Sequence, residues 1–176
     1  MLEALREEDL LLVLSWRNAP EVRGNMYSAH EISVVEHMNW YQETKNDPSR
    51  LDFIYSDEGR KCGVVYFTQL SIEKRTAFWG FYAASDAPKG TGLKMEYAAL
   101  EHAFSVLGLH KLNCEVIAFN RGVINMHKKT GFVEEGLFRD FHFDGATYHD
   151  VIRFGMLASE WEQCRPALLQ RIARVG

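Results

Sequence analysis

Hydrophobic positions near the start of the chain recur at the spacing of an α-helix. Asp9 stands as a possible N-cap before an apolar series at residues 10–16, and Ser33 stands three residues before Glu36, which is capping-box spacing. The second series fades before Pro48, since the residue before a proline disfavours helix. The pattern therefore predicts two amphipathic helices before any strand.

Three runs rich in β-branched and aromatic residues come next, at residues 51–55, 61–70 and 76–84. Short polar turns join them, so they are expected to form an antiparallel meander. The period then changes, because apolar side chains at 93, 97, 100, 104 and 107 recur at helical spacing and Gly108 ends the series. A long helix is therefore predicted after the meander.

The remaining pattern alternates between strand and helix. Residues 111–118 read as a strand, 120–130 as a short helix, and 132–143 with 147–157 as a hairpin that turns at Asp144-Gly145. A C-terminal helix is predicted at about 159–174. Without repeats or a Pro/Gly/Ser-rich linker, the 176 residues are expected to form a single α/β domain with a mixed, mostly antiparallel sheet flanked by helices.

Composition narrows the class of protein. With 47% hydrophobic residues and a net charge of -4, the chain can bury a core and has no overall basic surface for nucleic acid. Its three cysteines lack zinc-ligand spacing, so no metal site is expected. The acidic N-terminus is unlike a signal peptide and the apolar runs are too short to span a membrane, which predicts a cytoplasmic protein without a membrane partner.

A glycine-containing turn between the meander and the long helix is the first candidate site. Glycines let the main chain approach an anion closely, and a helix N-terminus can hold a phosphate. A turn without ligand is the alternative, and the spacing fits neither a Walker nor a Rossmann loop. The candidate residues are Lys89, Gly90, Thr91, Gly92, Leu93 and Lys94.

This turn, followed by a helix, a strand, Asn120, a short helix and Gly131-Phe132, closely resembles the GCN5-related N-acetyltransferase (GNAT) superfamily. The Leu5-Arg6 opening and the Trp16 to Pro20 stretch look like its ribosomal-protein-alanine acetyltransferase branch. Within that branch, Arg17-Asn18, Met26-Tyr27-Ser28 and the Gly80-Phe-Tyr82 strand look most like the PseH acetyltransferases of pseudaminic acid biosynthesis.

The resemblance implies the GNAT fold, in which the sheet splays where acetyl-CoA binds as cosubstrate. The gap would open between the strand carrying Phe81, Tyr82 and Ala83 and the strand at 111–118. The pantetheine would pair with the first of these strands, and the pyrophosphate would lie on the glycine turn. Asn120 would contact the cofactor, with capping of the next helix as its alternative role.

The same resemblance places His127 where many family members carry a tyrosine as general acid. We expect His127 to protonate the CoA thiolate, directly or through water, with packing beneath the cofactor as the alternative. Val123 is a second departure, because the branch often has serine there. Glu115 is a possible general base, although a water chain would serve as well.

For the acceptor, Arg17 could clamp a diphosphate, and Tyr27, Trp79 and Tyr82 could stack on a ring. The function implied is acetyl transfer to the 4-amine of a UDP-linked amino-dideoxy sugar, used for surface-glycan or flagellin modification. Rival functions are acetylation of a protein N-terminal amine or of a polyamine, and acyl-CoA binding without turnover. A homodimer is possible.

Overall fold

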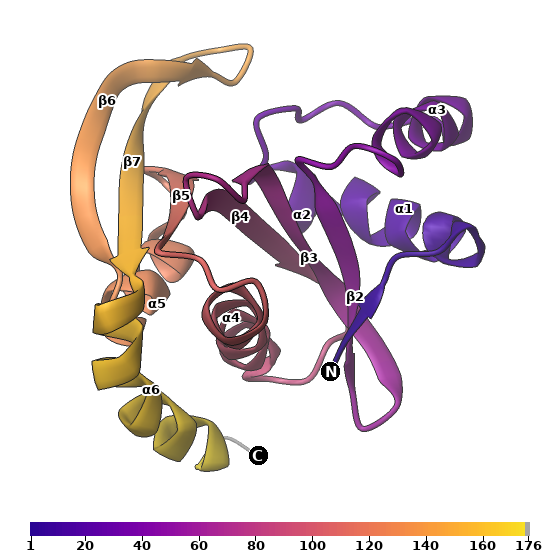
Figure 1. Cartoon of the computed structure of the whole chain (residues 1–176). Helices are drawn as coiled ribbons and strands as arrows, with labels where there is room; N and C mark the ends of the chain where they lie inside the picture. The colour runs from indigo at the N-terminus through magenta and orange to yellow at the C-terminus, as the bar shows by residue number, and fades with distance from the viewer. Residues whose placement is uncertain (175–176) are drawn as a thin grey trace.

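The computed structural model describes residues 1–174 and contains one seven-stranded mixed sheet (Figure 1). The strand order is β1-β2-β3-β4-β5-β7-β6. The predicted mixed and mostly antiparallel sheet is confirmed, since β4 and β5 are the parallel pair within the described chain. The strands are β1 (Leu2–Ala4), β2 (Leu51–Asp57), β3 (Arg60–Ser71), β4 (Thr76–Ala83), β5 (Lys111–Ile117), β6 (Val133–Phe143) and β7 (Tyr148–Leu157).

Helices cover both faces of this sheet. In Figure 1 the first three helices lie against one face of the N-terminal strands and α4 lies against the other. A short 3-10 turn at Glu7–Asp9 leads into the first helix, and a π-helical turn at His102–Val106 continues α4. The helices are α1 (Leu10–Asn18), α2 (Pro20–Arg23), α3 (Val34–Thr44), α4 (Thr91–Glu101), α5 (Arg121–Thr130) and α6 (Ala158–Ala173).

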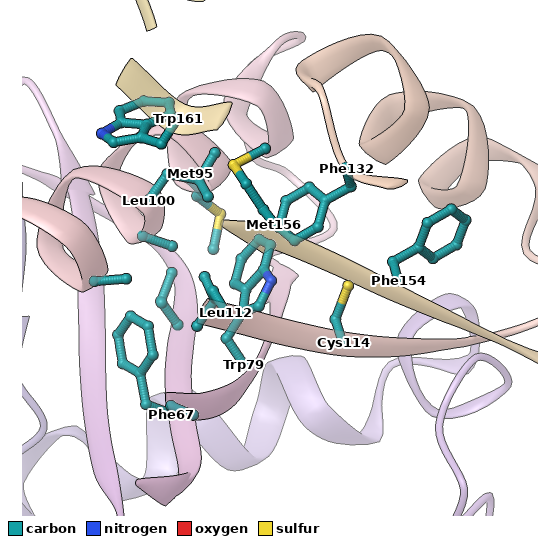
Figure 2. Packing of buried hydrophobic residues seen from close by; sticks show 14 of the residues in the cluster. Phe67, Trp79, Met95, Leu100, Leu112, Cys114, Phe132, Phe154, Met156 and Trp161 are labelled. Carbon is teal, nitrogen blue, oxygen red and sulfur yellow. The ribbon is translucent and has the colours of Figure 1, made fainter. Parts of the chain in front are cut away.

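The alternation of side chains along β3 explains why the sheet is covered twice. Val64 and Tyr66 point to the side of α1 and α3, whereas Val65 and Phe67 point into the larger core with α4. Figure 2 shows that larger core, where side chains from β3, β4, β5, β7, α4 and α6 meet. A strand buried on both faces needs apolar residues at successive positions, which is what β3 supplies.

The sheet consists of two antiparallel halves joined by a short parallel seam. β4 and β5 are in register only from Thr76 opposite Lys111 to Phe78 opposite Asn113. Beyond this point β4 pairs with β3 alone, and β5 pairs with β7 as far as Ile117. The strands therefore separate toward their carboxyl ends, as the resemblance implied.

Two short elements were not predicted from the sequence. β1 pairs with β2 over only three residues, and α2 begins at Pro20, a residue that suits the first turn of a helix. The predicted C-terminal helix is present as α6. Among the described residues no helix is long and apolar enough to cross a membrane.

Candidate active site

The gap between β4 and β5 contains a cavity of about 450 Å³. Its walls come from the separated ends of the two strands, the start of α5 and the segment after α2. The cavity brings together about half of the predicted site residues, whereas the glycine-turn residues 89–94 and Arg17 do not line it. Those present are Tyr27, Trp79, Phe81, Tyr82, Ala83, Asn120 and His127.

The wall formed by β4 offers hydrogen-bonding groups that the fold leaves unused. Beyond Phe78 this strand pairs with no strand on the β5 side among residues 1–174, so its outward amides and carbonyls are available to a ligand. The indole Nε1 of Trp79 is buried and has no hydrogen-bond partner within residues 1–174. An extended amide-containing chain would satisfy such a wall by strand-like pairing.

The glycine turn lies at the start of α4. Gly90 is its N-cap and has φ 91°, a left-handed conformation that favours glycine. The amides of Thr91 and Leu93 already donate to the backbone oxygens of Pro88 and Gly90, which leaves the Gly92 amide without a backbone acceptor among residues 1–174 at the positive end of the helix dipole. Lys89 is exposed, whereas the Lys94 ammonium donates to Asp57 at 2.7 Å and its charge is already partnered.

Asn120 caps α5 and also lines the cavity. Its side chain oxygen accepts from the amide of Val123 at 3.3 Å. The cap fixes where α5 begins, and about two turns later this helix presents His127 to the same cavity.

His127 is almost fully buried, with 2% exposed surface, among the rings of Trp79 and Phe132. Its Nδ1 lies 2.5 Å from a carboxylate oxygen of Glu96, a residue of α4 with 0% exposure. Burial alone lowers the pKa of His127, but the Cys114 sulfur and the Glu96 carboxylate outweigh burial and raise it to about 10. The imidazole is therefore protonated at neutral pH.

A second cavity of about 370 Å³ adjoins the first. Met26, Tyr27, Tyr66 and Tyr82 line both of them, so the two form one continuous concave surface. Arg17 lines this second cavity and not the gap itself. The residues predicted for the acceptor are thus divided, with Trp79 on the gap side, Arg17 on the far side and Tyr27 between them.

Arg17 has a hydrogen-bond donor that no other described residue satisfies. Its Nη2 donates to the backbone oxygen and the hydroxyl of Ser28, both at 2.8 Å, while its buried Nη1 has no partner within residues 1–174. Burial lowers the pKa of this guanidinium, which nevertheless stays charged. The buried Nε2 of His37 in the same cavity is likewise without a partner there.

Tyr27 and Glu115 form a linked pair at the boundary between the cavities. The Tyr27 hydroxyl donates to Glu115 at 2.9 Å, and Arg153 donates to the other carboxylate oxygen at 3.1 Å. Burial and the Glu115 carboxylate raise the pKa of Tyr27 well above its usual value, so the phenol stays protonated. Glu115 is therefore already hydrogen-bonded at both oxygens in this structure.

Glu96 and Tyr66 belong to the site but were not predicted from the sequence. The predicted apolar series on α4 begins at Leu93, but the buried face actually carries Met95, Ala99 and Leu100 with Glu96 among them. An acidic residue one turn before two small or apolar buried positions is the signal that could have revealed it. The sequence does not distinguish Tyr66 as a site residue, because an aromatic side chain on a strand usually packs in the core.

The site fits an acylated, phosphate-bearing cofactor. The unpaired edge of β4 suits the amides of a pantetheine arm, and the glycine turn at the start of α4 suits a pyrophosphate. Within residues 1–174 no three His, Cys, Asp or Glu side chains gather as a metal site would require.

Comparisons with known proteins agree with this geometry. Residues 1–133 match the family model described as an acetyltransferase (GNAT) domain. Spermidine N(1)-acetyltransferase of Escherichia coli K12 is 28% identical over 86% of this chain and 82% of its own. Acetyltransferase PseH of Campylobacter jejuni is 24% identical over 79% of this chain and 86% of its own.

The fold comparison gives the same family. A solved structure of spermidine N-acetyltransferase from Vibrio cholerae, in complex with CoA and spermine, superposes with a TM-score of 0.85 and 25% identity. The match covers 92% of this chain and 97% of that one. The chain belongs to the GNAT acetyltransferases and is an N-acetyltransferase that uses acetyl-CoA.

Proposed function

We propose that the acceptor is an amine on a nucleotide-linked sugar, namely the 4-amine of a UDP-linked amino-dideoxy sugar. The supporting observation is the Arg17 guanidinium, which is partly buried, positively charged and unsatisfied at Nη1 inside an aromatic-walled cavity beside the gap. Such a group suits a diphosphate, and Trp40, Tyr66 and Tyr82 around it suit flat or sugar rings.

The carboxylates around the second cavity favour the same acceptor. Asp52 is held by Arg50 through two hydrogen bonds of 2.6 and 2.8 Å, and Glu36 pairs with His30. Glu115 is engaged at both oxygens as described above. A polycation would need free carboxylates and would meet the unpaired charge of Arg17 instead.

A polyamine is the second candidate, and the comparisons favour it, because spermidine acetyltransferases are similar to this chain in both sequence and fold and share more identity with it than PseH does. Glu21, an exposed residue on the rim of the gap, is a carboxylate that a polyamine could reach. Acetylation of a protein N-terminal amine and acyl-CoA binding without turnover are the remaining candidates, and no contact in the two cavities favours either of them. A homodimer and a cytoplasmic location remain predictions.

In the proposed reaction the neutral amine attacks the acetyl carbonyl of the thioester, a C–N bond forms and the C–S bond breaks. The free amides of β4 stabilise the developing negative charge on the carbonyl oxygen. The amine nitrogen gives up one proton to solvent, and the departing sulfur takes one proton from His127. The imidazole then recovers its proton from solvent.

The experiment is release of free thiol from acetyl-CoA with three acceptors: a UDP-linked amino-dideoxy sugar, spermidine and a ribosomal-protein N-terminal peptide. We expect release with the sugar nucleotide. Replacing Arg17 with glutamine should raise the KM for this acceptor by about 10- to 100-fold, the usual value of a hydrogen bond to a charged group, and leave the KM for acetyl-CoA unchanged.

For spermidine, the Arg17 substitution should have the opposite effect on KM, so this variant distinguishes the sugar-nucleotide acceptor from the polyamine acceptor. If spermidine is the acceptor, removing the Arg17 charge should lower its KM rather than raise it. Arg6→Gln is the matched control, since Arg6 is exposed and forms only a loose pair with Glu8. Release with spermidine or the peptide alone would overturn the sugar proposal, and acetyl-CoA binding without release would favour the binding module.

A further inference from the structure

The only ion pair of the described chain with both partners almost fully buried lies directly behind the gap. Glu96 on α4 and His127 on α5 approach to 2.5 Å, and their side chains are 0% and 3% exposed. The carboxylate oxygen that faces His127 also accepts from the hydroxyl of Thr130 at 2.8 Å, whereas the second oxygen, Oε2, has no partner within residues 1–174.

This ion pair contributes little to the stability of the fold. A buried carboxylate loses its hydration, and an oxygen without a hydrogen bond adds to that cost. Apolar side chains of similar volume would fill the space between α4 and α5 at least as well. What the carboxylate does supply is a fixed negative charge against Nδ1 of the ring that lines the cavity.

The bond to Glu96 also fixes which nitrogen is available. Because Nδ1 is engaged with the carboxylate, a proton can be donated to the cavity only from Nε2. The rings of Trp79, Phe81, Phe132 and Phe154 surround the imidazole with centroid distances of 5.0 to 6.4 Å and limit its rotation.

We infer that Glu96 is a positioning residue that keeps His127 doubly protonated and oriented, so that Nε2–H serves as the proton donor to the CoA sulfur. The inference rests on His127 being the acid in the reaction proposed above. Glu96 does not touch the reacting atoms. In each turnover the proton moves from Nε2 to the sulfur, and the carboxylate charge favours its return from solvent.

The groups that raise the pKa of His127 come from two elements, since Glu96 lies on α4 and Cys114 on β5. Thr130 of α5 donates to Glu96 rather than to the imidazole. Cys164 of α6 is close enough to Glu96 to interact with its charge. Cys114 and Glu96 both raise the pKa of His127, and Glu96 is the one that lies against Nδ1 at 2.5 Å, so its removal should lower the proton affinity of the ring.

The test is the pH dependence of turnover in the wild type and in Glu96→Gln. The wild type should keep its acid protonated up to about pH 10, so the loss of the acid should not lower kcat between about pH 7 and 9. In Glu96→Gln only the Cys114 sulfur still opposes burial, so the pKa of His127 should fall, and kcat at about pH 8 should drop by about tenfold or more and recover toward about pH 6. The KM for acetyl-CoA should not change.

Two variants separate this role from a merely structural one. Glu96→Asp keeps the charge and should restore part of the turnover at about pH 8. Thr130→Val removes the other hydrogen bond to the same oxygen but keeps the carboxylate, so its pH profile should resemble the wild type. A Glu96→Gln profile identical to the wild type would overturn the inference.

A measurement without any acceptor keeps the inference independent of the substrate assignment. The ring nitrogen signals of His127, followed by NMR in the CoA complex, should show a doubly protonated imidazole at about pH 8 in the wild type. Glu96→Met, which conserves volume, replaces the glutamine variant if that one does not fold. A neutral His127 in the wild type at this pH would sink the inference even if the sugar nucleotide proves to be the acceptor.

Discussion

At the scale of single residues, Gly63 allows β3 to pack closely against β4 beside the gap. A Cβ on this glycine would lie 2.5 Å from the backbone oxygen of Tyr82 and 2.9 Å from the Cα of Ala83, and both belong to the wall of the gap. Backbone atoms cannot move aside cheaply, so the glycine is required by contact rather than by its φ angle.

We therefore expect Gly63→Ala to lower the free energy of unfolding by about 2 kcal/mol and to raise the KM for acetyl-CoA, because β4 must shift at Tyr82. Urea denaturation and steady-state kinetics measure the two effects. Gly136→Ala is the control, since nothing lies within 4 Å of its Cβ, and it should change stability by less than about 0.5 kcal/mol. Equal effects of both substitutions would contradict this role of Gly63.

At the scale of elements, the cap of α5 connects cofactor binding to the placement of His127. Asn120→Ala removes the bond to the Val123 amide and should cost about 1 kcal/mol of stability. Asn120→Ser keeps a capping oxygen but loses the amide, so it should keep the melting temperature while still raising the KM for acetyl-CoA. If serine restores both quantities, Asn120 acts only as a cap.

The period of the hydrophobic residues predicted the long helices and strands, because each of them buries one face in the core. The strands at 51–55, 61–70 and 76–84 and the hairpin at 132–157 are present, with ends that differ by a few residues. β1 could not be predicted, since three residues carry no period and its pairing depends on β2. The placement of Phe81 beside the gap followed from family resemblance, and Trp79 was predicted only as an aromatic contact for the acceptor. Glu96 depends on the packing of α4 against α5, so no local sequence pattern predicts it.

At the scale of the whole molecule, the short parallel seam divides the sheet into two units. β1 to β4 are successive strands along the chain, as are β5 to β7 (Figure 1). The two units share only the three register pairs between β4 and β5. A ligand in the gap would contact both units and so oppose their separation.

We expect acetyl-CoA to slow amide hydrogen exchange at residues 79–83 and to raise the melting temperature. At a ligand concentration about 100 times the Kd, the added stability should be about 2.7 kcal/mol. Exchange mass spectrometry measures the first effect, with the centre of β2 as an internal control that should not change. Protection of β2 alone would place the cofactor elsewhere.

The outer hairpin of β6 and β7 has a consequence for solubility at high concentration. β6 is an edge strand of eleven residues with exposed Leu137, Phe138, Phe141 and Phe143, a composition that invites strand addition from another copy. Two irregularities interrupt its register, at 134–136 and at 138–142, and Asp140 between the aromatic residues has φ 50°. These interruptions leave only short regular stretches for pairing with another copy, which opposes aggregation at this apolar edge.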